Sequence, residues 1–157
     1  MTTSTTTTIT ADRIEKRIHL RAPRARVWRA LTDLREFNAW FGCKLEGRFA
    51  PGAMVSGTAG CNGKQGGPMQ LTIERIEPQS LFSYRWHPFA TDPQADYSGE
   101  PTTLVEFHLA DADGGTRLTV IEAGFDALPE ERRQQAYPKH DAGWQQQLVN
   151  IERHVAS

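Results

Sequence analysis

The stretch RVWRALTDLREFNAWFG, residues 26–42, and the stretch HDAGWQQQLVNIERHV, residues 140–155, decide the fold of this chain. The first has apolar residues at helical spacing with a break near Thr32, which predicts two short helices in succession. The second carries an apolar stripe that begins at Trp144 and recurs at helical spacing, which predicts a long amphipathic helix. Between them, apolar and polar residues alternate as they do in strands. This order predicts a sheet that wraps around the last helix.

Seven stretches between residues 13 and 125 have the two-residue periodicity of strands, from RIEKRIHL at 13–20 to TRLTVIEAGF at 116–125. Turn signals separate several of them, including an Asn-Gly pair at 62–63. We therefore expect an α+β helix-grip fold. It has a curved antiparallel sheet of about six or seven strands on a long C-terminal helix, with two short helices after the first strand.

The last quarter of the chain contains two residues that disturb a helical pattern. Pro138 predicts an interruption, with a short helix or turn before it and the long helix from His140 onwards. Gly143 lies inside the long helix, where glycine costs about 1 kcal/mol relative to alanine. We expect a close approach of another backbone to Gly143 to offset that cost.

Length and charge restrict the partners that this chain can have. At 157 residues it has the length of one domain, which we place at 13–157 after a disordered threonine-rich tail at 1–12. The formal net charge is −1, so no overall field favours nucleic acid or an anionic membrane. No apolar run approaches the ~20 residues that a bilayer-spanning helix requires. We expect neither nucleic acid nor a membrane as a partner.

The cysteine and histidine patterns give no sign of a metal, a cofactor or export. Cys43 and Cys61 do not have metal-ligand spacing or form a disulfide framework, and the N-terminus lacks a secretory signal. The five histidines, His19, His87, His108, His140 and His154, do not have the spacing of a metal site. We expect a cytoplasmic protein with reduced thiols and with neither metal nor cofactor.

Large aromatic residues fall on the predicted inner faces of the sheet and the terminal helix. They can form a solid core, or they can line a cavity that binds a small apolar or amphipathic molecule, planar or acyl-like in shape. The arrangement of a sheet on a helix favours the cavity. The expected ligand-binding residues are Trp40, Phe82, Tyr84, Trp86, Phe107, Glu122, Phe125, His140 and Trp144.

Glu122 shares a strand face with Leu118 and Val120, so its carboxylate is expected to point inward. A carboxylate in that position needs a partner or becomes neutral. The candidate partners are Tyr84, Arg85 and His140. Three interpretations stay open: the strand end bends Glu122 to the water-exposed rim, Glu122 contacts a ligand, or Glu122 and His140 form an acid–base pair. We assign no catalytic residue, because no nucleophile and base stand at a recognisable spacing.

Two polar segments border the predicted cavity. The loop at 91–101 is either a solvated connector or a lid over the cavity mouth. The pair Arg132 and Arg133 is interpreted as a solvated helix face rather than an anion site.

The order of elements resembles the helix-grip fold of START-like and birch-pollen-allergen-like proteins. The local motifs resemble more closely the bacterial relatives of the activator of the heat-shock protein 90 ATPase. The matching residues are Pro23, Val27, Trp28, Ala30, Leu31, Thr32, Trp40, Phe41, Ser80, Leu81, Trp86, Thr116–Thr119, Gly124, Phe125, Gly143, Trp144 and Leu148. The chain departs from the family at Glu122, where many members carry histidine.

This resemblance implies a ligand-binding domain first, with two alternatives. One is an enzyme of the cyclase, dehydratase or hydrolase type that uses the same cavity. The other is an interaction module that stimulates a chaperone ATPase. A homodimer through a sheet edge is also open. The fold alone does not choose among these functions, because it hosts several.

Overall fold

A computed structural model describes residues 12–59, 68–88 and 96–156. The predicted tail before residue 12 and the Asn-Gly turn at 62–63 lie outside these residues. The elements, in chain order, are β1 (Arg13–Leu20), α2 (Arg24–Thr32), α3 (Leu34–Phe41), β2 (Cys43–Glu46), β3 (Met54–Ala59), β4 (Pro68–Glu77), β5 (Leu81–Trp86), β6 (Thr103–Ala112), β7 (Gly115–Ala123), the short 3-10 helix η1 (Phe125–Ala127) and α4 (Glu130–Ala156).

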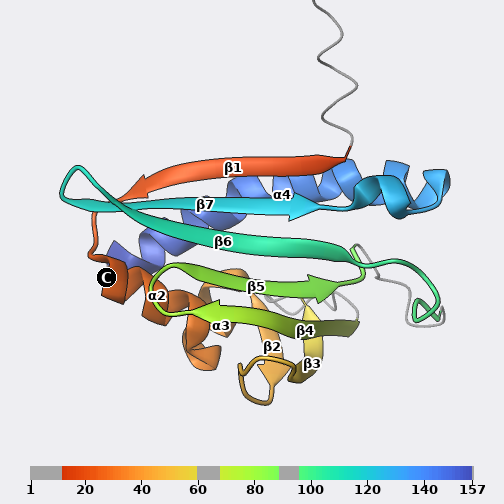
Figure 1. Ribbon diagram of the computed structural model, residues 1–157, viewed down its shortest axis with the longest axis horizontal. Coiled ribbons are helices and arrows are strands. Elements are labelled where there is room, and N and C mark those ends of the chain that lie inside the picture. Colours follow the sequence, from red (N-terminus) through yellow and green to blue (C-terminus); the bar gives the residue numbers. More distant parts are fainter. Residues whose placement is uncertain (1–11, 60–67, 89–95, 157) are drawn as a thin grey trace, which may run out of the picture.

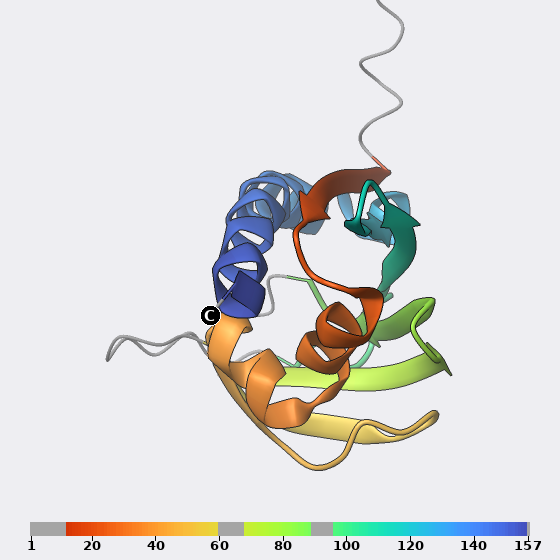
Figure 2. The ribbon, with the colours of Figure 1, turned by 90° about the vertical axis from the view of Figure 1, so that its left-hand side faces the viewer.

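The strands form one antiparallel sheet in the order β1-β7-β6-β5-β4-β3-β2. The three helices lie on one side of it, and α4 runs along β1 and β7 (Figure 1). Seen from the end, the sheet curves from β1 round to β2 and β3, with α2, α3 and α4 on its concave side (Figure 2). The predicted α+β helix-grip architecture, with seven strands and two short helices after the first, is confirmed.

The break predicted near Thr32 is a junction between two capped helices. Asp33 ends α2 and begins α3, where its side chain accepts a hydrogen bond from the backbone N–H of Glu36. Gly42 ends α3 in the left-handed conformation, at φ 86°, which glycine adopts without strain. This junction turns α3 so that Phe37 and Trp40 are buried.

The carboxylate of Glu36 ties the three helices together. It accepts hydrogen bonds from Arg26 at 2.7 Å, from Arg29 at 2.8 Å and from His154, near the end of α4, at 2.9 Å. Burial raises the pKa of Glu36, but the hydrogen bonds from His154 and Arg26 and the charges of Arg26 and Arg29 outweigh that effect and lower it to about 2. Of the two arginines in the first turn of α2, Arg26 is therefore compensated by Glu36, whereas Arg24 pairs with Asp111 at 3.0 Å.

Helix α4 is continuous, so the interruption predicted at Pro138 is wrong. Proline removes one helical hydrogen bond, here the bond to the carbonyl of Gln134. Pro138 is exposed, so water can satisfy that carbonyl. Packing supplies the rest: the buried residues of α4 are Ala136, Trp144, Leu148 and Ile151. Lys16 on β1 also pairs with Asp141 of α4 at 3.1 Å.

The core lies between the concave face of the sheet and the helices. Its largest fully buried side chains are Tyr84, Phe37, Phe82, Phe107, Phe125, Ile14, Leu20, Leu31, Leu71, Ile73, Leu118 and Ile151. None of the helices in the described residues combines the length and the hydropathy needed to cross a membrane.

Candidate ligand-binding site

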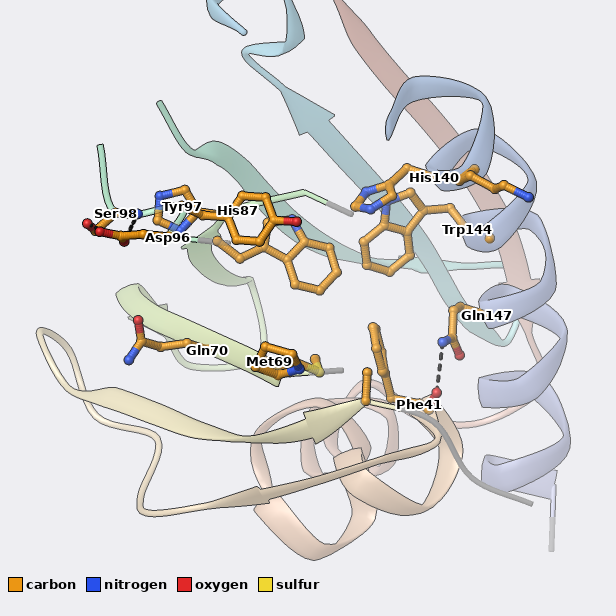
Figure 3. A pocket seen from close by; sticks show the side chains of 15 residues that line it. Phe41, Met69, Gln70, His87, Asp96, Tyr97, Ser98, His140, Trp144 and Gln147 are labelled. Carbon is orange, nitrogen blue, oxygen red and sulfur yellow. Dashed lines mark hydrogen bonds between the residues drawn. The ribbon is translucent and has the colours of Figure 1, made fainter. Parts of the chain in front are cut away.

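A cavity of about 430 Å³ opens between α4 and the strand ends that face it (Figure 3). Its volume lies within the range of about 300–1,000 Å³ that is usual for small-molecule sites. The lining residues are Phe41, Ala59, Pro68, Met69, Gln70, Trp86, His87, Asp96, Tyr97, Ser98, Lys139, His140, Gly143, Trp144 and Gln147. They come from α3, from β3, β4 and β5, from the segment at 96–98 and from one face of α4.

The carboxylate of Glu122 lies behind this wall and is fully buried. Its Oε1 accepts hydrogen bonds from Nδ1 of His140 at 2.6 Å and from the indole N–H of Trp144 at 2.8 Å. Its Oε2 accepts from the indole N–H of Trp86 at 2.8 Å and from the hydroxyl of Thr103 at 2.6 Å. The carboxylate of Glu122, on β7, therefore accepts hydrogen bonds from four donors that lie on β5, β6 and α4.

These contacts keep Glu122 ionised. Burial by itself raises the pKa of Glu122, but the positive charge of His140 and the hydrogen bonds from His140, Thr103 and Trp144 outweigh it. The pKa of the carboxyl group therefore lies below its ordinary value. The first interpretation, a water-exposed position at the rim, is wrong, because β7 stays regular to Ala123 and keeps Glu122 facing inward.

The same hydrogen bonds orient two walls of the cavity. Trp86 and Trp144 both turn their N–H groups toward Glu122, and their rings lie 6.1 Å apart at 34°. Phe41 contacts both of them, with ring centroids at 6.1 Å and 6.0 Å. Because the indole N–H groups are occupied, the three rings present carbon surface to the cavity. Phe41, Trp86 and Trp144 therefore form a rigid apolar part of the cavity wall.

The nine residues that the sequence analysis selected occupy three positions relative to the cavity. Trp86, His140 and Trp144 line it, and Glu122 lies behind them and bonds to all three. The other five are buried in the aromatic core beside it: Trp40, Phe82, Tyr84, Phe107 and Phe125. Some of the nine residues thus belong to a solid core and others to the cavity wall. The part that each of them plays in ligand binding stays a prediction.

Several of the five core residues support the walls from behind. The ring of Phe107 lies 5.7 Å from that of Trp144, and the ring of Tyr84 lies 5.3 Å from that of Trp86. Burial raises the pKa of the Tyr84 phenol, and the charge of Glu122 adds to that effect. Among the described residues no group bonds to the Tyr84 hydroxyl, so Tyr84 is not the partner of Glu122. Arg85 is not that partner either, because it pairs with Glu74 at 2.8 Å.

Gly143 differs from its prediction. Among the described residues no backbone approaches it, and a Cβ atom added there would meet none of their atoms within 4 Å. Gly143 instead lines the cavity, one residue before Trp144. The missing side chain leaves space for a ligand at the surface of α4 rather than for a neighbouring strand.

Arg132 holds the segment at 96–100 against α4, so its interpretation as a solvated residue is wrong. Its side chain is only 13% exposed. It donates hydrogen bonds to the carboxylate of Glu100 at 2.9 Å and to the carbonyl of Pro88 at 2.6 Å. Its guanidinium also lies 5.0 Å from the ring centroid of Tyr97. Tyr97 is thereby fixed at the cavity wall, and residues 91–95 of the loop at 91–101, interpreted as a connector or a lid, lie outside the described residues.

Sequence reasoning missed several lining residues, including Phe41, Met69, Tyr97, Lys139 and Gln147. Two of them carried a signal. Met69 shares strand parity with the buried Leu71, and Gln147 follows Trp144 by three residues, on the same helix face. The amide of Gln147 donates to the carbonyl of Phe41 at 2.8 Å, which joins α4 to the end of α3. Lys139 and Tyr97 had no such signal, because Lys139 is an exposed polar residue and Tyr97 lies in a segment without strand or helix periodicity.

In the described part of the chain, no group of three or more histidine, cysteine, aspartate or glutamate side chains could hold a metal ion. Among these residues the site is built from aromatic carbon, neutral hydrogen-bonding groups and the charged side chains of Asp96, Lys139 and the buried Glu122.

A family model described as "Activator of Hsp90 ATPase homolog 1-like protein" matches residues 21–156. The comparison with curated proteins found no match. Among solved structures, the chain is similar to protein MLL2253 from Mesorhizobium loti, with 23% identity, a TM-score of 0.72 and coverage of 92% of this chain and 96% of the other. It is also similar to a protein from Arthrobacter aurescens, with 19% identity, a TM-score of 0.77 and coverage of 94% and 88%.

A further similar structure is the Aha1 dimer from Colwellia psychrerythraea, with 14% identity, a TM-score of 0.68 and coverage of 91% and 95%. At these identities the solved structures bear on the fold alone. They agree with the helix-grip architecture described above.

Proposed function

This chain belongs to the family of activator of Hsp90 ATPase homolog 1-like proteins, and we propose that it binds a small apolar or amphipathic molecule between its sheet and α4. The observation that carries this proposal is the cavity of about 430 Å³, in which the buried carboxylate of Glu122 fixes the aromatic wall residues Trp86 and Trp144. Walls that are already ordered lose little conformational freedom when a ligand arrives. Such a cavity stays open instead of collapsing onto its own side chains.

The lining is suited to an amphipathic ligand rather than to a hydrocarbon. One part is the carbon surface of Phe41, Trp86 and Trp144, and another consists of polar side chains from α4 and from the segment at 96–98. Sites of this kind bind by apolar contact and orient the ligand with a few polar groups.

The test is binding of N-phenyl-1-naphthylamine, a neutral dye whose fluorescence rises in apolar surroundings. We expect saturable one-to-one binding to the wild-type chain. Gly143→Leu places a side chain in the open space beside α4 and should weaken binding at least tenfold. The matched control is Ala142→Leu, because Ala142 is exposed, is next in sequence and does not line the cavity. Equal affinity of the two variants would place the dye elsewhere and refute the proposal.

A second function, acid–base catalysis in the same cavity, is favoured by one observation. His140 lines the cavity while its Nδ1 donates to Glu122 at 2.6 Å. A carboxylate in this position holds the imidazole in one orientation and stabilises its charged form. Glu122 has its four donors and serves as the positioning group, which leaves His140 as the group that would exchange a proton. Catalysis requires that His140→Gln abolish turnover of a bound molecule while its affinity stays within twofold.

A further inference from the structure

The polar groups of the cavity are distributed unevenly between its sides. Trp86 and Trp144 give their N–H groups to Glu122, and the amide nitrogen of Gln147 gives a hydrogen to the carbonyl of Phe41. The two indole N–H groups are therefore unavailable to a ligand, and one of the two N–H groups of Gln147 is occupied. The polar groups left to a ligand are neutral side chains such as Gln70 and the charged residues of the lining, and only the charged residues distinguish an anion from a neutral group.

Positive charge lies on the α4 side of the cavity. Lys139 and His140 are consecutive in α4, and both line the site. The carboxylate that balances His140 belongs to Glu122, which is fully buried and is not part of the lining. Of this hydrogen-bonded pair, only the imidazole of His140 reaches the cavity.

Lys139 brings a positive charge to the α4 side of the cavity. Lys16 is paired with Asp141 at 3.1 Å, whereas within the described residues no acidic side chain forms an ion pair with Lys139. The charge of Lys139 is thus available to a ligand at the cavity wall.

Negative charge lies on the segment that faces α4. Among the described residues that line the cavity, Asp96 is the one acidic residue, and its carboxylate accepts from the backbone N–H of Ser98 at 3.0 Å and from the Ser98 hydroxyl at 2.7 Å. Figure 3 shows Asp96, Tyr97 and Ser98 on the side of the cavity opposite His140 and Trp144. An anionic group would therefore be repelled from the segment at 96–98 and attracted to α4.

We propose that the ligand is an organic acid whose carboxylate lies beside Lys139 and His140 and whose apolar body covers Phe41, Trp86 and Trp144. This inference rests on the proposed function and adds the polarity and the orientation of the ligand. An aryl acid and a fatty acid share this chemistry.

The experiment compares two probes with the same apolar body, 2-naphthoate and 2-naphthalenemethanol, by isothermal titration calorimetry at pH 7. We expect the carboxylate to bind about tenfold more tightly than the alcohol, as a charge-assisted contact exceeds a neutral one. Lys139→Gln should remove most of this preference and change the affinity for the alcohol by less than twofold. Lys139 is exposed and lies on the surface of α4, so this substitution leaves the core intact.

Lys44→Gln is the matched control, because Lys44 is an exposed residue of β2 that does not line the cavity. It should keep the wild-type preference for the carboxylate. Equal binding of the two probes to the wild type, or an unchanged preference in Lys139→Gln, overturns the inference and leaves the proposed function in place. Failure of both probes and of the neutral dye to bind would remove both.

Discussion

Replacing Glu122 by glutamine tests the structural basis of the site. The carboxylate accepts four hydrogen bonds, two at each oxygen. A glutamine side chain has one oxygen and one NH₂ group. In either orientation its NH₂ group meets two donors, so two buried donors lose their acceptor. The substitution also removes the negative charge that faces His140.

The expected loss follows from these counts. A buried polar group without a partner costs about 1–3 kcal/mol, and breaking a buried ion pair from one side costs about 3–5 kcal/mol. We expect Glu122→Gln to lower the free energy of unfolding by about 3–5 kcal/mol, which for a domain of this size lowers Tm by about 6–20 °C.

The assay is urea unfolding at pH 7, followed by tryptophan fluorescence and by circular dichroism. The control is Glu74→Gln, which removes an exposed carboxylate paired with Arg85 and should change stability by less than about 1 kcal/mol. If Glu122→Gln costs no more than this control, the four-donor carboxylate does not hold the walls in place, and the reasoning fails.

Three further predictions concern other parts of the molecule. Gly143→Ala should raise the free energy of unfolding by about 1 kcal/mol, because the new methyl group meets no atom of the described residues within 4 Å and alanine favours the helix. A loss of stability on urea unfolding would contradict this prediction. The pKa of Glu36 is about 2 in the folded chain and near 4.3 in the unfolded chain. The ionised carboxylate therefore stabilises the folded chain fully above about pH 4.3, and this stabilisation is lost as the pH falls toward 2. Glu36→Gln should therefore destabilise the chain at pH 6 and much less at pH 2.5 in urea titrations; an equal loss at both would contradict the assignment. Arg132→Ala should release the segment at 96–100 and speed hydrogen exchange at the backbone amide of Glu100, which donates to the carbonyl of Tyr97. Arg133→Ala is the control. Equal exchange rates in the two variants would refute the role of Arg132.

Much of the fold could be predicted because it depends on periodicity. The alternation in 116–125 placed Glu122 on the same face as Leu118 and Val120, and all three are buried. The break near Thr32 and the stripe from Trp144 are likewise direct consequences of which residues face the core.

The contacts of the site were only partly predictable. Parity places a side chain on a face, but it does not show where an indole N–H points, so Trp86 and Trp144 were expected as walls and not as donors to Glu122. Thr103 was missed because its role depends on the register between β6 and β7. The prediction at Pro138 was wrong because propensity at one exposed position is outweighed by the packing of a whole helix.

Ligand binding in the cavity is tested most directly by native mass spectrometry of the chain purified from the cells that make it naturally. The native mass is compared with the mass of the denatured chain. We expect the native protein to carry a reproducible extra mass of one small molecule per chain, which is lost on denaturation. The same extra mass should be absent from Gly143→Leu produced in the same cells. A wild-type chain that carries no extra mass, or a Gly143→Leu variant that carries the same one, would contradict ligand binding in the cavity.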